Sequence, residues 1–472
     1  RTITHVRGRM LGGSSSLNGM VYVRGNPRDF DGWASLGLPD WSYAHCLPYF
    51  KKLESNDRGA NDYRGGDGPI GITTHKADWP IFQAFLKAGE QAGHPISGDY
   101  NAFRQEGTCV YQANIRRGVR ASAGLAYLRP ALKGGRIELR LNALVSRIRF
   151  SGNKRAVGID YSSGGDNHSV EAEREIILCG GSYNSPHVLM LSGVGPKQHL
   201  ASHGITAIAD VPGVGRGLQD HVVAQVRYFA ARAGISPGVG MNALQMGVTG
   251  AQWMFLRNGL GATNFWETGT FFKSHADVDF CNIQHEFVPL IFDYGADKVE
   301  FTEGLAYQTC LMRPKSRGFI ELTSADPTVH PRIVNNYLQH EDDRRAMIAA
   351  VKHTDEIIQQ PAWDGLRGKA ECPPLRQLPD AEVMAWLRTV GNTQYHPSAT
   401  CRMGTDDMAV VDAEGRVNGV TGLRVIDASV MPRITSGNLN CPTMMIAEKL
   451  TDRIRGRALP PQPMPYADML KH

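Results

Sequence analysis

The chain has 472 residues, and 51 Lys and Arg against 46 Asp and Glu residues give a formal net charge of +5 at pH 7. A hydrophobic share of 42% is ordinary for a globular enzyme, and the length allows two to three domains. The sequence has no block of like charges typical of a nucleic-acid-binding arm, and no apolar run of the roughly 18 residues that span a membrane. We therefore expect a globular protein that does not bind nucleic acid.

The eight cysteines are dispersed, with no CxxC pair and no Cys/His cluster at the spacing of a zinc site. This pattern favours free, mostly buried thiols in a reducing compartment over disulfides. We expect a cytoplasmic protein without a bound metal, and association with a membrane surface stays open.

The first 60 residues combine glycine-rich loops with short apolar segments. The run "GRMLGGSSSLN" from Gly8 has the glycines and small hydroxyl residues of a loop that lets a backbone approach a ligand. Further on, "AHCLPYFKKLES" has apolar residues at Leu47, Phe50 and Leu53, and this spacing predicts an amphipathic helix.

Strands are predicted in the middle of the first half. The stretch "IELRLNALVSRIRFSGNKRAVGIDYSSGG" contains two alternating runs around a polar turn, which predicts adjacent antiparallel strands. The strand "REIILCGG" from Arg174 then leads through a Gly-Gly turn into "SYNSPHVLMLSGVGP", where Pro186 favours the first turn of a helix. Such a strand, turn and helix would present helix-terminal N–H groups to a ligand.

From Ala207 to about Thr393, longer segments with aromatic residues indicate an α+β region with an antiparallel sheet. Its most apolar stretch, "MNALQMGVTGAQWMFL" from Met241, is interrupted by polar residues and glycines, so we expect it on or near a cavity. The C-terminal part returns to an α/β pattern, with a strand "LRVIDAS", a loop "TSGNLNCPT" and a helix "TMMIAEKLTDRIRGR". Residues 459–472 are predicted to form an irregular, Pro-rich tail.

Four stretches carry a family resemblance. They are "GRMLGGSSSLNGMVYVRGNPRDFDGW" from Gly8, "GSYNSPHVLMLSGVG" from Gly181, "GVGRGLQDH" from Gly213, and "YHPSATCRMG" from Tyr395 followed by "VIDASVMPRITSGNLNCPTMMIAEK". In this order they resemble the glucose-methanol-choline (GMC) flavoprotein oxidoreductases, and within that family the choline and alcohol dehydrogenases. The resemblance covers nearly the whole chain.

The resemblance implies an α/β plus α+β fold. A Rossmann-like FAD-binding domain would take residues 1–60, 135–225 and 394–458, and a substrate-binding domain on an antiparallel sheet would take residues 61–134 and 226–393. The family opens with a strand, a GxGxxG loop and a helix that hold the ADP half of FAD. No such fingerprint occurs here, because "GVGRG" from Gly213 lacks the strand-to-helix context. We therefore expect an FAD-binding domain that is incomplete at its N-terminus, with a missing N-terminal segment that supplies the rest.

The residues expected to contact FAD begin with Gly12, Gly13 and Ser14, since small residues suit close contact with the cofactor. The resemblance implies further contacts at Asn18, Gly19, Val21, Val145, Asp427, Ala428 and Asn438. An acidic residue that closes a strand is also a common helix cap, and this alternative stays open for Asp427. Choline oxidases of the family carry a flavin-linked His where this chain has Leu17, so FAD is expected to be non-covalent.

Two residues are expected to be catalytic. His396 in "YHP" matches the active-site histidine of the family, and Asn440, which follows 440 − 396 = 44 residues later, matches the residue beside the flavin. A lone histidine is more often structural, and Asn438 in the same loop could be mistaken for Asn440, so both alternatives stay open. In an alcohol oxidation an imidazole suits removal of the hydroxyl proton, while the amide of Asn440 would orient the substrate oxygen.

Substrate contacts are expected at Glu267 and Trp266. Choline-oxidising relatives carry a carboxylate facing the quaternary ammonium at the position of Glu267, and the indole of Trp266 could add a cation-π contact. Neighbours in an extended segment point to opposite sides, so both side chains cannot line one pocket there. A structural role for Glu267 is the alternative.

The expected function is FAD-dependent oxidation of a primary alcohol, choline-like or other, to the aldehyde. The carbon-bound hydrogen would leave as hydride to flavin N5, and electrons would pass to a quinone or other acceptor. An oxidase that uses O2 is the first alternative, and a hydroxynitrile lyase, which keeps FAD without net redox chemistry, is the second. A homo-oligomer stays open.

Overall fold

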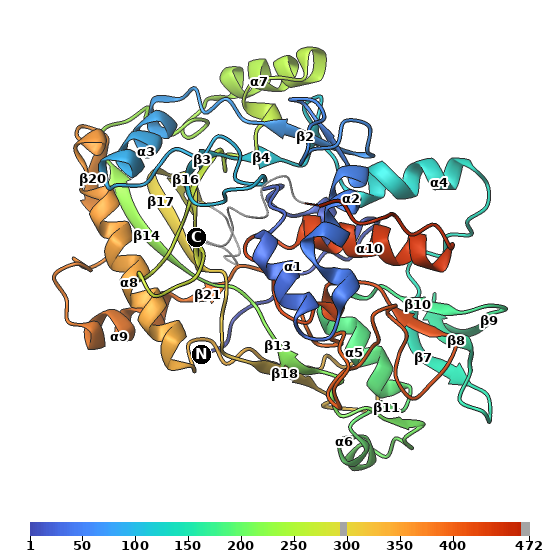
Figure 1. Cartoon of the computed structure of the whole chain (residues 1–472). Coiled ribbons are helices and arrows are strands. Elements are labelled where there is room, and N and C mark those ends of the chain that lie inside the picture. The colour runs from blue at the N-terminus through green and yellow to red at the C-terminus, as the bar shows by residue number, and fades with distance from the viewer. Residues whose placement is uncertain (293–299, 464–472) are drawn as a thin grey trace.

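The computed structural model describes residues 1–292 and 300–463, and Figure 1 shows two halves packed against each other. One half is built on a large antiparallel sheet, and the other on a parallel strand pair with helices and a three-stranded meander. Each half has a hydrophobic core of its own. The expected fold class, α/β plus α+β with an antiparallel sheet, is confirmed.

The large sheet has seven strands in the order β20-β14-β17-β16-β15-β3, and β21 also pairs with β14. The bounds are β3 Gly107–Val110, β14 Val222–Ala230, β15 Thr268–Phe272, β16 Ile283–Ile291, β17 Thr302–Leu311, β20 Arg367–Ala370 and β21 Asn392–Thr393. Every residue of β16 is buried, as in a strand that is covered on both faces. The register places Glu286 of β16 beside Gln308 of β17.

Three helices pack on one face of this sheet, namely α3 Pro80–Gln91, α8 Glu341–Ile358 and α9 Asp380–Val390. Acidic residues fill the first turn of α8, where they complement the positive end of the helix dipole. Met347 and Val351, four residues apart, lie on the buried side of α8. They belong to the same core as Phe287 and Trp363, whose rings lie 5.6 Å apart.

The second half follows the expected α/β pattern. It comprises α1 Pro27–Ala34, α2 Tyr43–Leu53, α5 Gly181–Leu191, α10 Asn440–Ile454, the parallel pair β10 Ile176–Leu178 and β22 Leu423–Val425, and the meander β7 Leu144–Phe150, β8 Ala156–Ser163 and β9 Asp166–Glu171. The expected antiparallel strands are β7 and β8, and β9 extends them. Pro186 lies inside α5 rather than in its first turn, which corrects that expectation.

Short elements complete the chain. They are β1 Glu54–Asn56, β2 Ile70–Thr74, β4 Gln112–Ala113, β5 Ile115–Arg116, β6 Val119–Arg120, α4 Arg129–Lys133, β11 Val194–Gly195, α6 Lys197–Ser202, β12 Ala209–Asp210, β13 Arg216–Leu218, α7 Ala243–Leu256, β18 Gly318–Glu321 and β19 Arg332–Val334. Of the expected tail, residues 464–472 lie outside the described residues.

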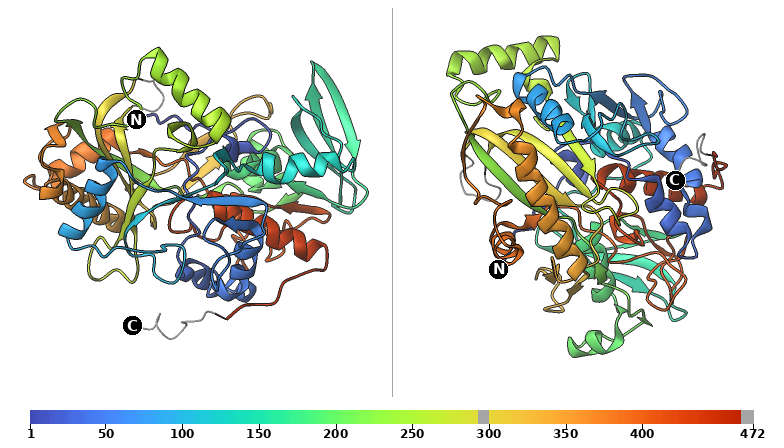
Figure 2. Two further views of the ribbon diagram at one scale, coloured as in Figure 1. Left: turned by 90° about the horizontal axis from the view of Figure 1, so that it is seen from above. Right: turned by 60° about the vertical axis from the view of Figure 1, so that its left-hand side comes forward.

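The apolar stretch from Met241 is not part of a cavity wall. It forms α7, which has no buried residue and lies at the periphery in Figures 1 and 2. Among the described residues, none of α7 lines the cavity described below, so a place on its wall is not observed.

All eight cysteines are free thiols and six of them are buried, which confirms the expected free, mostly buried thiols. In the part of the chain that the structure describes, no helix is long and apolar enough to cross a membrane. Within the same residues, no group of three or more His, Cys, Asp or Glu side chains is placed to hold a metal ion.

Candidate active site

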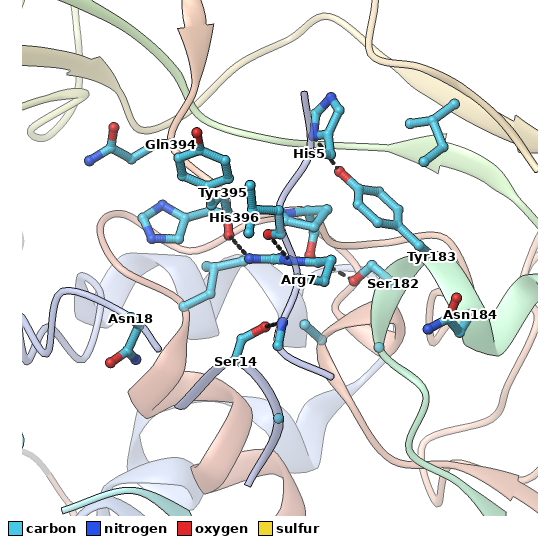
Figure 3. A pocket seen from close by; sticks show the side chains of 18 of the residues that line it. His5, Arg7, Ser14, Asn18, Ser182, Tyr183, Asn184, Gln394, Tyr395 and His396 are labelled. Atoms are coloured by element: carbon cyan, nitrogen blue, oxygen red, sulfur yellow. Dashed lines mark hydrogen bonds between the residues drawn. The ribbon is translucent and has the colours of Figure 1, made fainter. Parts of the chain in front are cut away.

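A cavity of about 2710 Å³ runs between the two halves. Its walls come from the N-terminal loop, the ends of β7 and β10, the start of α5, strands β16 and β17, and the loops before and at the start of α10. Figure 3 shows part of it, with Ser14 and Asn18 on one side and Tyr183 and His396 on others. This volume exceeds the roughly 300–1,000 Å³ of ordinary small-molecule sites, so a large cofactor and a substrate fit together.

The cavity collects nearly all the residues singled out from the sequence. Those expected to contact FAD all line it, namely Gly12, Gly13, Ser14, Asn18, Gly19, Val21, Val145, Asp427, Ala428 and Asn438. His396, Asn440, Trp266 and Leu17 line it as well, whereas Glu267 does not. Segments far apart in the sequence therefore meet at one site.

The glycine-rich loop presents bare backbone to this cavity. Gly13 has a φ of 55°, and an added Cβ would meet nothing within 4 Å. Gly12, at a φ of 88°, touches the backbone of Gly124, since an added Cβ would lie 2.7 Å from the Gly124 nitrogen. Both positions need glycine, Gly12 for close packing and Gly13 for a left-handed backbone that faces the ligand space.

Asp427 acts as a helix cap as well as lining the cavity. Its carboxylate accepts the N–H of Gly181 at 2.9 Å, the hydroxyl of Ser185 at 2.6 Å and the N–H of Ser429 at 2.8 Å. The alternative that Asp427 caps a helix is therefore confirmed. The N–H of Gly181, expected to face a ligand at the start of α5, is held by Asp427 instead.

The backbone around His396 is strained. Tyr395 and Ala399 have φ values of 63° and 69°, in the left-handed region that non-glycine residues rarely adopt. Such conformations persist only where surrounding contacts impose them, and they concentrate at functional sites. The loop from Tyr395 to Ala399 is thus held in shape for His396.

Three polar side chains hold this loop. The buried carboxylate of Asp220 accepts the N–H of His396 at 2.8 Å. Arg7 donates to the carbonyl of Tyr395 at 2.8 Å, and the hydroxyl of Ser182 donates to the carbonyl of Pro397 at 2.7 Å, as Figure 3 shows. The anchors come from separate parts of the chain, so the loop position depends on the whole fold.

The imidazoles of His396 and His221 form a pair. Their Nδ1 atoms lie 3.0 Å apart. Burial lowers the pKa of His221 to about 3, against carbonyl groups of Met312 and Thr435 that act to raise it. Burial, followed by the charges of His221 and Arg7, lowers the pKa of His396 well below 6.5. Both rings are therefore neutral at pH 7.

Hydrogen bonding around Asn438 fixes which nitrogen of His396 is protonated. The Asn438 Nδ2 donates to Glu286 Oε1 at 2.7 Å, and its Oδ1 accepts from Gln284 Nε2 at 3.2 Å. The same Nδ2 therefore faces the His396 Nε2, at 3.5 Å. Because an amide N–H faces a lone pair, this arrangement favours the tautomer of His396 with an unprotonated Nε2 and the proton on Nδ1, toward His221.

The two asparagines of the loop before α10 have different partners. Asn440 is the first residue of α10, and its Nδ2 donates to Asn114 Oδ1 at 3.2 Å. Asn438 is the one whose amide faces His396. Both line the cavity, and spacing along the sequence could not separate them.

Glu267 belongs to the structure around the cavity. Its carboxylate accepts the N–H of Ala77 at 3.0 Å and the hydroxyl of Thr263 at 2.6 Å. Trp266 lines the cavity and Glu267 does not, which favours the structural alternative for Glu267, since adjacent residues of an extended segment point apart.

Glu286 is the carboxyl group that the sequence reasoning missed. It lines the cavity, is 3% exposed, and accepts hydrogen bonds from Asn438 and from Gln394. Burial raises its pKa to about 7 against these two donors. The one signal in the sequence is an acidic residue inside the otherwise buried strand "NIQHEFVPL".

Together, a cavity with bare glycine backbone, a buried imidazole and amide donors is typical of a cofactor-dependent oxidoreductase. Family models described as GMC oxidoreductase match residues 1–223 and residues 314–447. The chain belongs to the GMC oxidoreductase family, and its cofactor is FAD.

Relatives support this assignment. The chain is 46% identical to an oxygen-dependent choline dehydrogenase of Pseudomonas aeruginosa (strain UCBPP-PA14) over 464 residues, which are 97% of this chain and 82% of the relative. It is 45% identical to an oxygen-dependent choline dehydrogenase of Paraburkholderia phymatum over 455 residues, 96% of this chain and 79% of the relative.

The fold is also similar to those of solved oxidases. The crystal structure of pyridoxine 4-oxidase from Mesorbium loti superposes with a TM-score of 0.86 at 27% identity, covering 97% of this chain and 86% of that chain. A formate oxidase, at 24% identity and a TM-score of 0.87, shares the fold, covering 95% of this chain and 84% of that chain.

Proposed function

We propose that this enzyme oxidises a primary alcohol, of the choline type, to the aldehyde. The observation that carries the proposal is the neutral imidazole of His396, whose unprotonated Nε2 faces Asn438 at the cavity. The names of the oxygen-dependent choline dehydrogenases support the substrate class. Bound FAD would accept the hydride at flavin N5, which is chemistry that the side chains lack.

The residues of the cavity fit FAD. Gly13 and Gly181 have positive φ values, and an added Cβ at either would meet no atom within 4 Å, so bare backbone can approach the cofactor. Leu17 lines the cavity with a side chain that has no nucleophile, which supports a non-covalent cofactor.

In the proposed reaction, His396 Nε2 takes the hydroxyl proton. A buried neutral imidazole needs no prior deprotonation at pH 7, and His221 holds the ring in the required tautomer. The amides of Asn438 and Asn440 can donate to the substrate oxygen and hold its carbon against the cofactor.

We assign recognition of a cationic substrate to Glu286. Its carboxyl group lies on the cavity wall, whereas Glu267 is engaged with Ala77 and Thr263. Trp266 supplies an aromatic face to the same cavity, which suits a quaternary ammonium group.

Two candidate activities, a dehydrogenase and an oxidase, differ in their electron acceptor. A dehydrogenase passes electrons to a quinone or similar acceptor, and an oxidase passes them to O2. Turnover with an artificial acceptor that exceeds turnover with O2 supports the dehydrogenase, whereas H2O2 formed at the same rate as aldehyde supports the oxidase.

The test is anaerobic reduction of the bound flavin by choline, benzyl alcohol and medium-chain alkanols. We expect bleaching by choline at a rate that exceeds that of the alkanols. Absence of bleaching with every alcohol would contradict alcohol oxidation and favour a lyase without net redox chemistry. In the matched pair Glu286→Gln and Glu267→Gln, choline affinity should fall only in the first.

A further inference from the structure

Arg120 is a charged residue on the cavity wall that the proposed reaction does not use. It ends strand β6 and is half-buried beside the Gly-Ser loop, residues 11–18. Burial lowers the pKa of Arg120, and within residues 1–292 and 300–463 no carboxylate forms an ion pair with it. Burial of a cation is costly unless the cation has partners, so other contacts have to account for its position.

The guanidinium of Arg120 binds the Gly-Ser loop. Its Nη1 donates to the carbonyl of Asn18 at 2.6 Å and to the side-chain Oδ1 of Asn18 at 2.8 Å. A longer contact of 3.4 Å reaches the carbonyl of Ser15. Hydrogen bonds from a charged donor are stronger than neutral ones, so Arg120 holds both the backbone and the amide of Asn18.

Backbone pairing fixes the position of Arg120. Strand β6 pairs with β5, and the N–H of Ala121 donates to the carbonyl of Asn114 at 2.8 Å. The N–H of Asn114 donates in turn to the carbonyl of Met20 at 2.8 Å, two residues after Asn18. The hairpin and the Gly-Ser loop are thus joined through their main chains, and the side chain of Arg120 starts from a fixed point.

The residues after Arg120 pack against the same loop. The N–H of Ala123 donates to Ser15 Oγ at 3.0 Å. A Cβ added at Gly12 would lie 2.7 Å from the nitrogen of Gly124, so the two backbones touch. The segment that carries Arg120 therefore supports the Gly-Ser loop at several points.

The contact with Arg120 also orients the amide of Asn18. Its Oδ1 accepts from Arg120 at 2.8 Å and from the N–H of Met20 at 3.2 Å. Both donors require an oxygen at this place, so the other end of the amide is Nδ2. Among the described residues Nδ2 has no hydrogen-bond partner, and Asn18 lines the cavity (Figure 3). The amide therefore keeps a donor for a group bound in the cavity.

We propose that Arg120 is a positioning residue of the cofactor site, which turns the amide of Asn18 so that Nδ2 donates to an acceptor atom of bound FAD. FAD has acceptor atoms in its phosphates, its ribityl chain and its flavin ring. A reversed amide would present Oδ1 to them and would repel them. The inference rests on FAD as the cofactor and holds for any alcohol substrate and for either electron acceptor.

Release of FAD from the holoenzyme tests the proposal, followed after dilution by the flavin fluorescence that returns on dissociation. We expect Asn18→Ala to release FAD about tenfold faster than the wild type, as for the loss of one hydrogen bond. Arg120→Met should accelerate release at least as much. In the double variant the rate should stay within about twofold of that of Arg120→Met, because without Arg120 the amide of Asn18 no longer faces FAD.

Further variants separate this role from general support of the fold. Asn18→Asp keeps an oxygen for Arg120 and replaces Nδ2 by a second oxygen, so it should release FAD faster than Asn18→Ala does, with an unchanged far-UV circular dichroism spectrum. Arg117→Met removes an exposed arginine of the same hairpin and should release FAD at the wild-type rate. Arg120→Lys replaces Arg120→Met in the double-variant comparison if the latter does not retain FAD.

Two results would overturn the proposal. One is an Asn18→Asp holoenzyme that releases FAD at the wild-type rate. The other is an effect of Asn18→Ala on FAD release that is equally large with and without Arg120, because Arg120 would then act independently of Asn18.

Discussion

Two pairs of histidines in this protein have similar contacts and different surroundings. His221 and His396 meet at 3.0 Å at the cavity, and His94 and His353 meet at 2.7 Å between the end of α3 and α8. The second nitrogen of His353 lies 3.0 Å from Glu356, whereas the second nitrogen of His396 faces Asn438 at the cavity. Contact between imidazoles therefore does not by itself indicate a base, and what sets His396 apart is its position at the cavity.

The largest effect is expected for the proposed base, His396. His396→Gln should lower the rate of anaerobic flavin reduction by about 1,000-fold, because general-base catalysis contributes roughly 10²- to 10⁴-fold. His353→Gln, in the outer pair, should stay within about twofold of the wild type. Equal rates in the two variants would remove His396 from the proposed reaction.

A smaller effect is expected for His221, the imidazole partner of the proposed base. His221→Leu leaves Nδ1 of His396 without an acceptor, and we expect flavin reduction to slow on the order of 10- to 100-fold. His221→Gln can restore the acceptor and should recover part of the rate, while His94→Leu should not change it. If His221→Leu and His221→Gln lower the rate of flavin reduction equally, and the loss of rate follows the loss of stability, His221 has only a structural role.

Glu286 should act on affinity. Its pKa of about 7 means that the carboxyl group is neutral at pH 6 and ionised at pH 8, so KM for choline should fall as pH rises through about 7. In Glu286→Gln this pH dependence should vanish, and KM at pH 8 should rise about tenfold. A neutral alcohol measured alongside should show neither effect, and a choline KM independent of pH in the wild type would contradict the assignment.

The smallest effect concerns stability. Burial and then His353 lower the pKa of His94 from 6.5 to about 4, so the folded state resists protonation of this ring. Its contribution to stability is present above pH 6.5 and is lost as pH falls toward 4. We expect the melting temperature of His94→Gln to fall less than that of the wild type between pH 6.5 and 4. An identical slope in both proteins would show that His94 does not control this loss.

Local patterns were sufficient for much of the fold. The alternating runs around Lys154 specify the hairpin of β7 and β8, and the amphipathic spacing after Tyr43 specifies α2. The quoted motifs also led to the residues that line the cavity, because each motif lies where a loop or helix start meets the ligand space.

Local sequence patterns could not predict which side chains reach the cavity, because this depends on tertiary contacts. Glu267 and Glu286 both occur among apolar residues, and only the arrangement of the strands shows which one reaches the cavity. The role of His221 lay unnoticed at the end of "GVGRGLQDH", since its partner is far along the chain. Helix α7 is apolar in composition, and the sequence did not indicate that none of its residues is buried.

The tautomer of His396 tests the central claim most directly. In protein labelled with ¹⁵N-histidine, with His396→Gln used to assign its signals, the account predicts a protonated Nδ1 and an unprotonated Nε2 at pH 7. A protonated Nε2, or a doubly protonated ring at that pH, would contradict it.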